Sequence, residues 1–243
     1  MLNNFKLLLI LSIALIYNCS GNKSETRLPL STNSMEASNM YHEAMYLNNI
    51  YMGDKAKVKL EEAVKIDPDF GAAFIMLSTF GSNSVSETDT YYEKALSLKS
   101  KMNDVEKCFL EIRSSYRNDD IKTRMQASER LIDLLPENAI AYERMAYTQY
   151  EMANIKDSRN SALKAIELDR YYSPAYSILV NSYTFNEPKS FEEAEKYAKL
   201  VLAFNKDRSF YHVMLGDVFR AQNKLQEAAK KYDDALNTGT NNY

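Results

Sequence analysis

The chain has 243 residues, of which 45% are hydrophobic and 26% are charged, a composition that can bury a core and is not that of a disordered protein. It holds 18 Tyr but only 6 Gly and 5 Pro, which favours helices over many short strands joined by turns. The formal net charge of -3, with both signs interleaved, argues against nucleic-acid binding, because that function normally needs a clustered basic face.

The first segment of the chain is typical of an export signal. Lys6 gives it a positive start, and the apolar run from Leu7 to Tyr17 is interrupted only by Ser12. This run is too short to cross a membrane as a helix, which takes about 20 apolar residues. Residues 1–18 are therefore predicted to be a signal peptide.

Cys19 follows this run at once, and the stretch Ile16-Tyr17-Asn18-Cys19 resembles the cleavage and lipidation site of bacterial lipoproteins. The resemblance implies that Cys19 is the lipidated first residue of an exported protein, anchored to a membrane of the bacterial envelope and facing the periplasm or the cell surface. The alternatives are an ordinary cleaved signal and an uncleaved anchor. Residues 19–36 are predicted to be a tether, because Ser20 to Met35 has too little apolar content to fold alone.

Side chains of similar kind recur every 34 residues through the rest of the chain. Bulky residues mark one ladder, consisting of Met40, Phe74, Cys108, Tyr142 and Tyr176, with His212 after 36 more residues. Smaller residues follow four places later, at Ala44, Ser78, Ile112, Ala146, Val180 and Gly216. Two further ladders occupy the second half of each repeat, at Ala56, Thr88, Arg124, Ser158, Ala194 and Ala228, and at Ala63, Ala95, Leu131, Ala165, Val201 and Ala235.

The four ladders keep one register if length changes fall only in turns, as a repeat of helix pairs requires. The second repeat then has a turn two residues short, the connection after it is two residues long, and the turn near Glu187-Pro188 is two residues long. Pro68 and Pro136 mark the ends of second helices, and Ser190 with Glu193 forms a capping-box pattern. Each half-repeat is an amphipathic helix with small residues where two helices cross.

This period, the small residues at the crossings, and stretches such as Leu60 to Pro68 and Tyr92 to Leu96 resemble the tetratricopeptide repeat (TPR). The resemblance covers residues 37–243 and implies an all-α, right-handed superhelix of about six helix-turn-helix units. First helices of such a superhelix line a concave groove that binds peptides or protein partners. The units are 37–70, 71–104, 105–138, 139–172, 173–208 and 209–242.

No catalytic, metal or cofactor site is predicted. The two histidines, His42 and His212, belong to the first and last units, so a metal site shared by them would require the ends of the solenoid to meet. His42 is expected to be solvated near the groove and His212 to be a packing residue. Cys108 lies in the bulky ladder, where a free cysteine behaves as a small hydrophobe. The six glycines do not form a phosphate-binding motif.

The predicted groove has two sets of residues. The first set is the residue that directly follows each small crossing residue, and the second set lies three residues, or about one helical turn, further along the same helices. Arg113 is expected to grip a carboxylate, and Tyr147 with Tyr150 to give apolar contact. The tyrosines could equally pack between repeats. This set does not match the basic and amide residues by which some TPR proteins hold a terminal carboxylate. The predicted groove consists of Met45, Asn48, Thr79, Arg113, Tyr116, Tyr147, Tyr150, Asn181, Asp217 and Arg220.

The leading hypothesis is a monomeric, non-catalytic scaffold that is anchored to an envelope membrane and binds a peptide or protein. Its plan resembles that of small envelope lipoproteins that assist outer-membrane barrel or pilus-secretin assembly. The alternatives are a glycan-binding lipoprotein whose tyrosines stack on sugar rings, a general accessory lipoprotein, and an enzyme with an unfamiliar site.

Overall fold

The computed structural model describes residues 26–240, and the predicted all-α fold is confirmed over these residues. The chain forms pairs of helices, one pair to each predicted unit. The pairs are α2 (Met35–Asn49) with α3 (Gly53–Ile66), α4 (Gly71–Leu77) with α5 (Val85–Ser97), α6 (Asp104–Asn118) with α7 (Ile121–Leu134), α8 (Ala139–Glu151) with α9 (Ile155–Leu168), α10 (Ser173–Phe185) with α11 (Phe191–Phe204), and α12 (Ser209–Ala221) with α13 (Leu225–Thr240). A 3-10 turn, η1 (Lys99–Lys101), follows α5.

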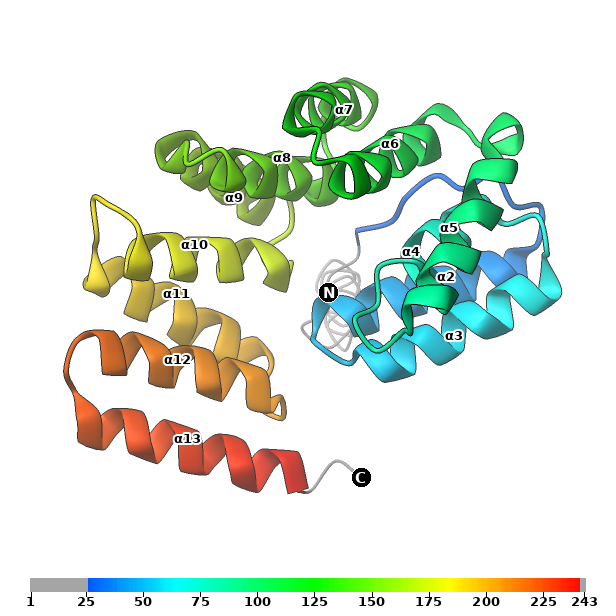
Figure 1. Ribbon diagram of the computed structural model, residues 1–243. Coiled ribbons are helices and arrows are strands. Elements are labelled where there is room, and N and C mark those ends of the chain that lie inside the picture. The colour runs from blue at the N-terminus through cyan, green and yellow to red at the C-terminus, as the bar shows by residue number, and fades with distance from the viewer. Residues whose placement is uncertain (1–25, 241–243) are drawn as a thin grey trace, which may run out of the picture.

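The units stack in chain order and curve into an arc (Figure 1). The arc runs from α2 to α5 on one side of the view, through α6 to α9, to α10 to α13 on the other side. Each first helix packs on its own second helix, and most second helices pack on the first helix of the next unit. This is the solenoid arrangement that the repeat predicts.

The small residues of the ladders are buried where the helices of a pair cross. Ala44, Ala56 and Ala146 have no exposed surface. At the crossing in the last unit, a Cβ atom added to Gly216 would lie 2.5 Å from Cε1 of Tyr232, so only glycine fits against that ring. The crossings therefore depend on side-chain size, because two helices approach closely only where the residues between them are small.

The length changes fall in turns at two of the three predicted places. The connection from Leu98 to Asn103 and the turn from Asn186 to Ser190 are each two residues longer than the usual ones. The prediction for the second unit was wrong, because the shortening falls in helix α4 and not in the turn after it. Helix α4 ends at Leu77, where Asn83 Nδ2 donates a hydrogen bond to the Leu77 carbonyl at 2.7 Å.

The helix ends follow the predicted signals closely. Helices α3 and α7 end just before Pro68 and Pro136, since proline cannot continue a helix. Ser190 caps α11 by accepting a hydrogen bond from the Glu193 N–H at 3.3 Å. The side chain of Glu193 pairs with Lys196, at 2.9 Å, in place of the reciprocal bond of a capping box.

Residues 26–34 are not the free tether that the sequence suggested. They run as an extended segment along the inner side of the arc, between α2 and α6 (dark blue in Figure 1), and hydrogen-bond to four different connections between units. Two features hold this segment in place. The side chain of Leu28 is buried, and hydroxyl and main-chain groups of the segment form hydrogen bonds with polar side chains of the solenoid. The predicted signal peptide, Cys19 and residues 20–25 of the predicted tether lie outside the described residues, and residues 35–36 of that tether are the start of α2.

The two ends of the solenoid meet, which the sequence did not indicate. The ring of Tyr51, in the turn after α2, stacks on Phe210 of α12 with centroids 3.4 Å apart. The hydroxyl of Tyr211 donates a hydrogen bond to the Asn49 carbonyl at 3.1 Å, and Tyr51 bonds Ser177 of α10 at 3.3 Å. These contacts, between residues far apart in the sequence, fix the curvature of the arc.

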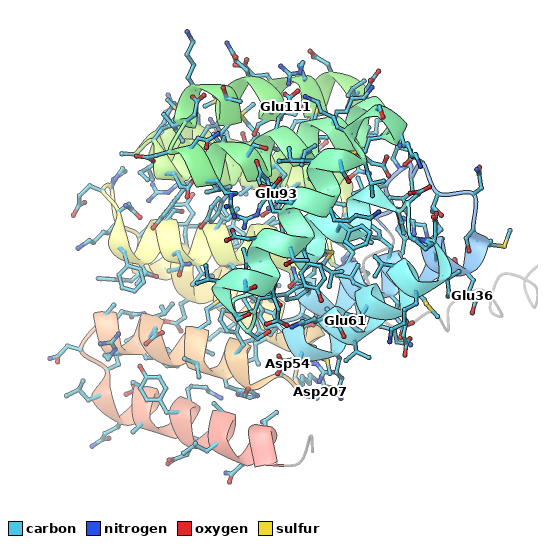
Figure 2. All side chains as sticks on the ribbon, turned by 45° about the vertical axis from the view of Figure 1, so that its right-hand side comes forward. Glu36, Asp54, Glu61, Glu93, Glu111 and Asp207 are labelled. Carbon is cyan, nitrogen blue, oxygen red and sulfur yellow. The ribbon has the colours of Figure 1, made fainter. Side chains whose placement is uncertain are left out.

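Many carboxylates lie on solvent-facing helix surfaces, whereas Glu106 and Glu143 are buried. The residues labelled in Figure 2 come from several elements along the chain. Glu61 lies 3.9 Å from the ammonium of Lys57, and Glu111 pairs with Arg130. No group of three His, Cys, Asp or Glu side chains capable of holding a metal ion occurs within residues 26–240.

Four of the turns inside units contain one non-glycine residue in the left-handed region: Tyr51, Asp119, Ala153 and Asn223. Asn and Asp tolerate this conformation, whereas alanine is strained by its Cβ. Ala153, at φ 57°, is exposed, so the free-energy cost of its backbone conformation can be measured without a change in packing.

We therefore expect Ala153→Gly to raise the free energy of unfolding by about 1 kcal/mol, because glycine adopts this conformation without strain. Ala229→Gly, at an exposed position inside α13, is the matched control and should lower it by about 0.5 to 1 kcal/mol. Urea unfolding followed by circular dichroism measures both. A loss of stability in both variants would show that the turn is not strained.

Candidate functional site

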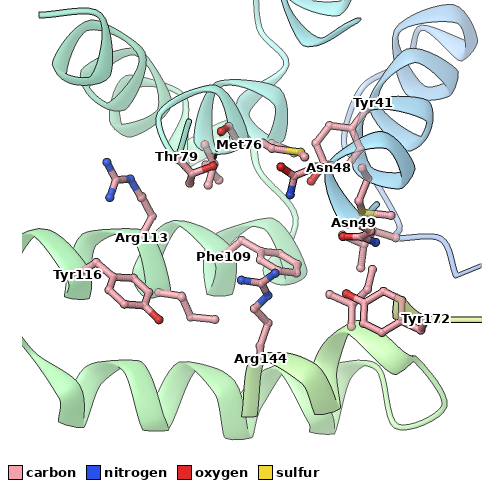
Figure 3. A pocket seen from close by; sticks show the side chains of 16 residues that line it. Tyr41, Asn48, Asn49, Met76, Thr79, Phe109, Arg113, Tyr116, Arg144 and Tyr172 are labelled. Carbon is pink, nitrogen blue, oxygen red and sulfur yellow. Dashed lines mark hydrogen bonds between the residues drawn. The ribbon is translucent and has the colours of Figure 1, made fainter. Parts of the chain in front are cut away.

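A cavity of about 180 Å³ opens on the inner face between the first helices of the first four units (Figure 3). It is lined from α2, α4, α6 and α8, from Leu28 of the extended segment, and from Tyr172 before α10. Its full lining is Leu28, Tyr41, Met45, Asn48, Asn49, Ala72, Ile75, Met76, Thr79, Phe109, Ile112, Arg113, Tyr116, Ile140, Arg144 and Tyr172.

Most of this wall is apolar or aromatic, and its charged residues are both arginines. Arg113 and Phe109 project from α6, and Arg144 projects from α8 toward the same space (Figure 3). The amide side chains of Asn48 and Asn49 lie on the α2 side. The cavity therefore combines apolar contact with positive charge, a chemistry that favours an anionic group attached to an apolar one.

Arg144 is held in the cavity wall by its neighbour on α8. Its Nε lies 2.8 Å from Oε2 of Glu143, whose side chain is almost fully buried. Consecutive residues of a helix point about 100° apart, so the two groups form an ion pair without a well-aligned hydrogen bond. Burial opposes the charge on Arg144, but the Glu143 carboxylate outweighs it and raises the pKa of the guanidinium. Arg144 is thus positively charged, and it lines the cavity together with Tyr172.

Arg113 also lines the cavity, but it is not the free carboxylate grip that the sequence suggested. Its Nε donates to Oγ of Ser78 at 2.9 Å, and an Nη donates to the Ser78 carbonyl at 2.8 Å. These bonds tie α6 to the carboxyl end of α4. Burial lowers the pKa of the Arg113 guanidinium, consistent with a group partly withdrawn from water. The edge formed by Nε and this Nη, which could grip a carboxylate side-on, is therefore occupied within the protein.

The sequence left two roles open for the tyrosines, contact with a partner in the groove and packing between repeats, and Tyr116 lies where both are possible. It lines the cavity, and its ring also lies under the guanidinium of Arg124, with the Arg124 Cζ 3.4 Å from the ring centroid. Its hydroxyl donates to Glu151 of the next unit at 3.0 Å, and Glu151 pairs with Arg124. The large residue at position 124 is thus accommodated because it bridges the third and fourth units.

The structure brings half of the predicted groove residues together. Met45, Asn48, Thr79, Arg113 and Tyr116 line the cavity, whereas the other five lie elsewhere. Asp217 and Arg220 pair with each other at 3.2 Å, and Tyr147 and Asn181 are exposed. Sequence reasoning missed Tyr41, Phe109, Arg144 and Tyr172, because it took only the residues that follow the small crossing positions. A signal for two of them was present: Tyr41, Ile75 and Phe109 recur every 34 residues, one place after the bulky ladder.

His42 is not freely solvated, although the sequence had suggested that it would be. His42 is half-buried, and its ring bonds to the Ser38 carbonyl at 2.8 Å and to the main chain of Leu28. His212 bonds to the Lys206 carbonyl at 3.0 Å. Although the ends of the solenoid meet, each ring is thus held by its own part of the chain. Cys108 is buried, and burial raises the pKa of its thiol, as in a packing residue.

Neither a protein-family model nor a curated protein matches this chain. Solved structures do match. PilW, a widely conserved type IV pilus biogenesis factor, is 14% identical over 82% of this chain and 91% of PilW, with a TM-score of 0.52. Cut9 in the APC/C hetero-tetramer Cut9–Hcn1 is 13% identical over 85% of this chain and 41% of the matched chain, with a TM-score of 0.56. TTC0263, a thermophilic TPR protein in Thermus thermophilus, is 14% identical over 85% of this chain and 93% of its own, with a TM-score of 0.48.

The fold is therefore that of a TPR solenoid, in agreement with the repeat in the sequence. At these identities the likeness concerns the fold alone, since one fold serves many functions. Within residues 26–240, none of the helices has the length and apolar character to cross a membrane.

We expect Arg113→Ala to lower the free energy of unfolding by about 1.5 to 3 kcal/mol, because it removes charged hydrogen bonds that join two units. Tyr147→Ala is the control, since this side chain is 43% exposed, and its effect should stay within about 0.5 kcal/mol. Thermal and urea unfolding measure the difference. Equal stability of the two variants would show that the bonds of Arg113 to Ser78 do not stabilise the fold, and that Arg113 is free to contact a partner.

Proposed function

We propose that this protein is a non-catalytic scaffold that binds an extended segment of a partner protein on the inner face of its solenoid. The observation that supports the proposal is the cavity, whose wall is apolar except for amides, hydroxyls and two arginines. An acidic side chain next to an apolar one fits this wall. Arg144 would face the carboxylate, because Arg113 is already bonded to Ser78.

The size of the cavity favours a protein side chain over a sugar chain. Sites that enclose a whole small molecule have volumes of about 300 to 1,000 Å³. The present volume of about 180 Å³ is smaller and suits one or two side chains. Tyr41 and Tyr172 are also buried in the wall, where their ring faces are not open to stacking on a sugar. A glycan partner is the alternative that the binding experiment below distinguishes.

The proposal includes export and anchoring through Cys19, which is supported by the leader sequence. Cys19 precedes Thr26, whose hydroxyl bonds Asp169 of the solenoid, by seven residues. A chain of that length spans at most about 25 Å. A lipid on Cys19 would therefore keep the solenoid close to the membrane surface. The mature side-chain charge is -4, from -3 minus the 1 of Lys6, so it provides no electrostatic substitute for the anchor.

We further propose that the protein acts in the assembly of an envelope complex. The support is the fold shared with PilW, a pilus biogenesis factor, together with the lipoprotein-like leader. The solenoid is expected to be monomeric, because solvated polar side chains such as Gln226, Glu227 and Lys230 occupy part of the last helix.

Thr79→Trp tests the cavity as the binding site. Thr79 is exposed at the cavity wall, so tryptophan there should fill the opening and weaken partner binding at least tenfold, about 1.4 kcal/mol. Asn181→Trp is the matched control, since Asn181 is exposed at the same repeat position of the fifth unit but outside the cavity.

The measurement is affinity capture from native membranes with each full-length variant, followed by titration of the captured protein. Circular dichroism checks that both variants fold. Equal binding by the two variants would exclude the cavity as the site. Capture of glycan in place of protein, lost in Thr79→Trp only, would favour the glycan alternative.

Cys19→Ala tests the anchor. We expect wild-type protein to fractionate with membranes and to carry a lipid-modified amino terminus at Cys19, and the variant to lose both properties. Intact mass and membrane fractionation measure these outcomes. An unmodified wild-type amino terminus, with membrane association unchanged by the substitution, would contradict lipidation.

A further inference from the structure

The segment from Thr26 to Thr32, here called the strap, lies across the solenoid like a bound peptide. It contains no helix or strand, yet it is held at nearly every residue. Its direction is opposite to the order of the units, because Thr26 lies at the connection between the fourth and fifth units and Thr32 at that between the first and second.

The partners of the strap form a row of polar side chains at the first four connections between units and, for Glu106, in the first turn of α6. Asp169 accepts from the Thr26 hydroxyl at 2.6 Å, and Asp67 accepts from the Thr32 hydroxyl. Between them, side-chain amides donate to main-chain carbonyls: Asn138 to Arg27 at 2.7 Å and Asn103 to Pro29 at 3.2 Å. This row, Asp67, Asn103, Glu106, Asn138 and Asp169, is here called the track.

Two groups of the solenoid are shaped to receive main-chain N–H groups of the strap. Glu106 is almost fully buried; its Oε2 accepts from the Asn103 N–H in a capping box, and its Oε1 accepts from the Ser31 N–H at 3.0 Å. His42 bonds the Ser38 carbonyl through Nδ1 at 2.8 Å, and its Nε2 lies 3.2 Å from both the N–H and the carbonyl oxygen of Leu28. With the proton on Nδ1, Nε2 accepts from the Leu28 N–H. Burial lowers the pKa of His42, which favours this neutral form.

One side chain of the strap enters the solenoid. Leu28 is 6% exposed and forms part of the wall of the cavity described above. Recognition is thus through the main chain and hydroxyls at the track, with one leucine in an apolar site. This division, main-chain hydrogen bonds for affinity and one pocket for selectivity, is how proteins bind extended peptides.

We propose that the track is a binding site for an extended polypeptide segment, occupied here by the strap as an intramolecular ligand. Release of the strap would open the track and the Leu28 side of the cavity together. A separate peptide must compete with a strap that is covalently attached. Its apparent affinity is therefore reduced in proportion to the fraction of molecules whose track is empty: the smaller that fraction, the weaker the binding. The inference deepens the proposed function by naming a segment that governs access to the same inner face.

The test uses the full-length chain and a fluorescent synthetic peptide with the sequence of residues 26–34. Leu28→Ser in the protein removes the apolar anchor of the strap, and this variant should bind the peptide at least tenfold more tightly than wild type. A peptide with serine in place of the leucine should not bind. Hydrogen exchange should show the Leu28 and Ser31 amides protected in wild type, and the Ser31 amide unprotected in Leu28→Ser.

Val85→Ser is the matched control, because Val85 is an apolar residue 80% exposed on α5, and it should bind the peptide no better than wild type. If Leu28→Ser fails to fold, the double variant Thr26→Val, Thr32→Val replaces it under the same criteria. It removes the hydroxyl bonds to Asp169 and Asp67, together with the bond that Thr32 Oγ1 accepts from the Ser34 N–H, and it leaves Leu28 in place. Equal or absent peptide binding in the folded strap variant and in wild type would overturn the proposal. The experiment uses no partner protein, so its failure leaves the result of Thr79→Trp standing.

Discussion

Helix pairs in this protein depend on small side chains at the point where their two helices cross. Ala44, Ala56 and Gly216 let the helix axes approach closely, and the bulkier residues are then free to pack against the next unit. A single pair cannot bury its apolar faces alone, so the stack is stable only as a series. The inner face, its cavity and the turns that carry the strap partners all follow from this one constraint on size.

The fold could be predicted because this constraint repeats. Four ladders with one register located every helix pair, and the proline and serine signals located several helix ends. The error in the second unit has a physical cause: the ladders record how many residues separate two crossings, not how those residues divide between helix and turn. Helix α4 ends early because Ser78 and Asn83 supply alternative partners for its last carbonyls.

The site was less predictable, because it arises between elements that are not neighbours in sequence. Arg144 follows Glu143 in an ordinary helix, and nothing in that pattern shows that α8 turns Arg144 into the cavity while Glu143 is buried beside it. Arg113 and Tyr116 were found by position, but their bonds to Ser78 and Glu151 depend on the stacking of whole units. The strap was not predicted because its own polar composition is that of a linker. The residues that hold it belong to the track, which is distant from it in the sequence. The capping-box pattern of Asn103 and Glu106 was the one local signal at that place.

The strap reverses the usual relation between order of synthesis and order of assembly. Repeat units contact mainly their neighbours, so each can pack as soon as the next has emerged from the ribosome. Thr26 is made before any unit, yet its partner Asp169 is separated from it by 143 residues. The amino-terminal end of the strap therefore reaches its place only after the fourth unit has formed, whereas Thr32 can bond Asp67 as soon as the first two units have stacked.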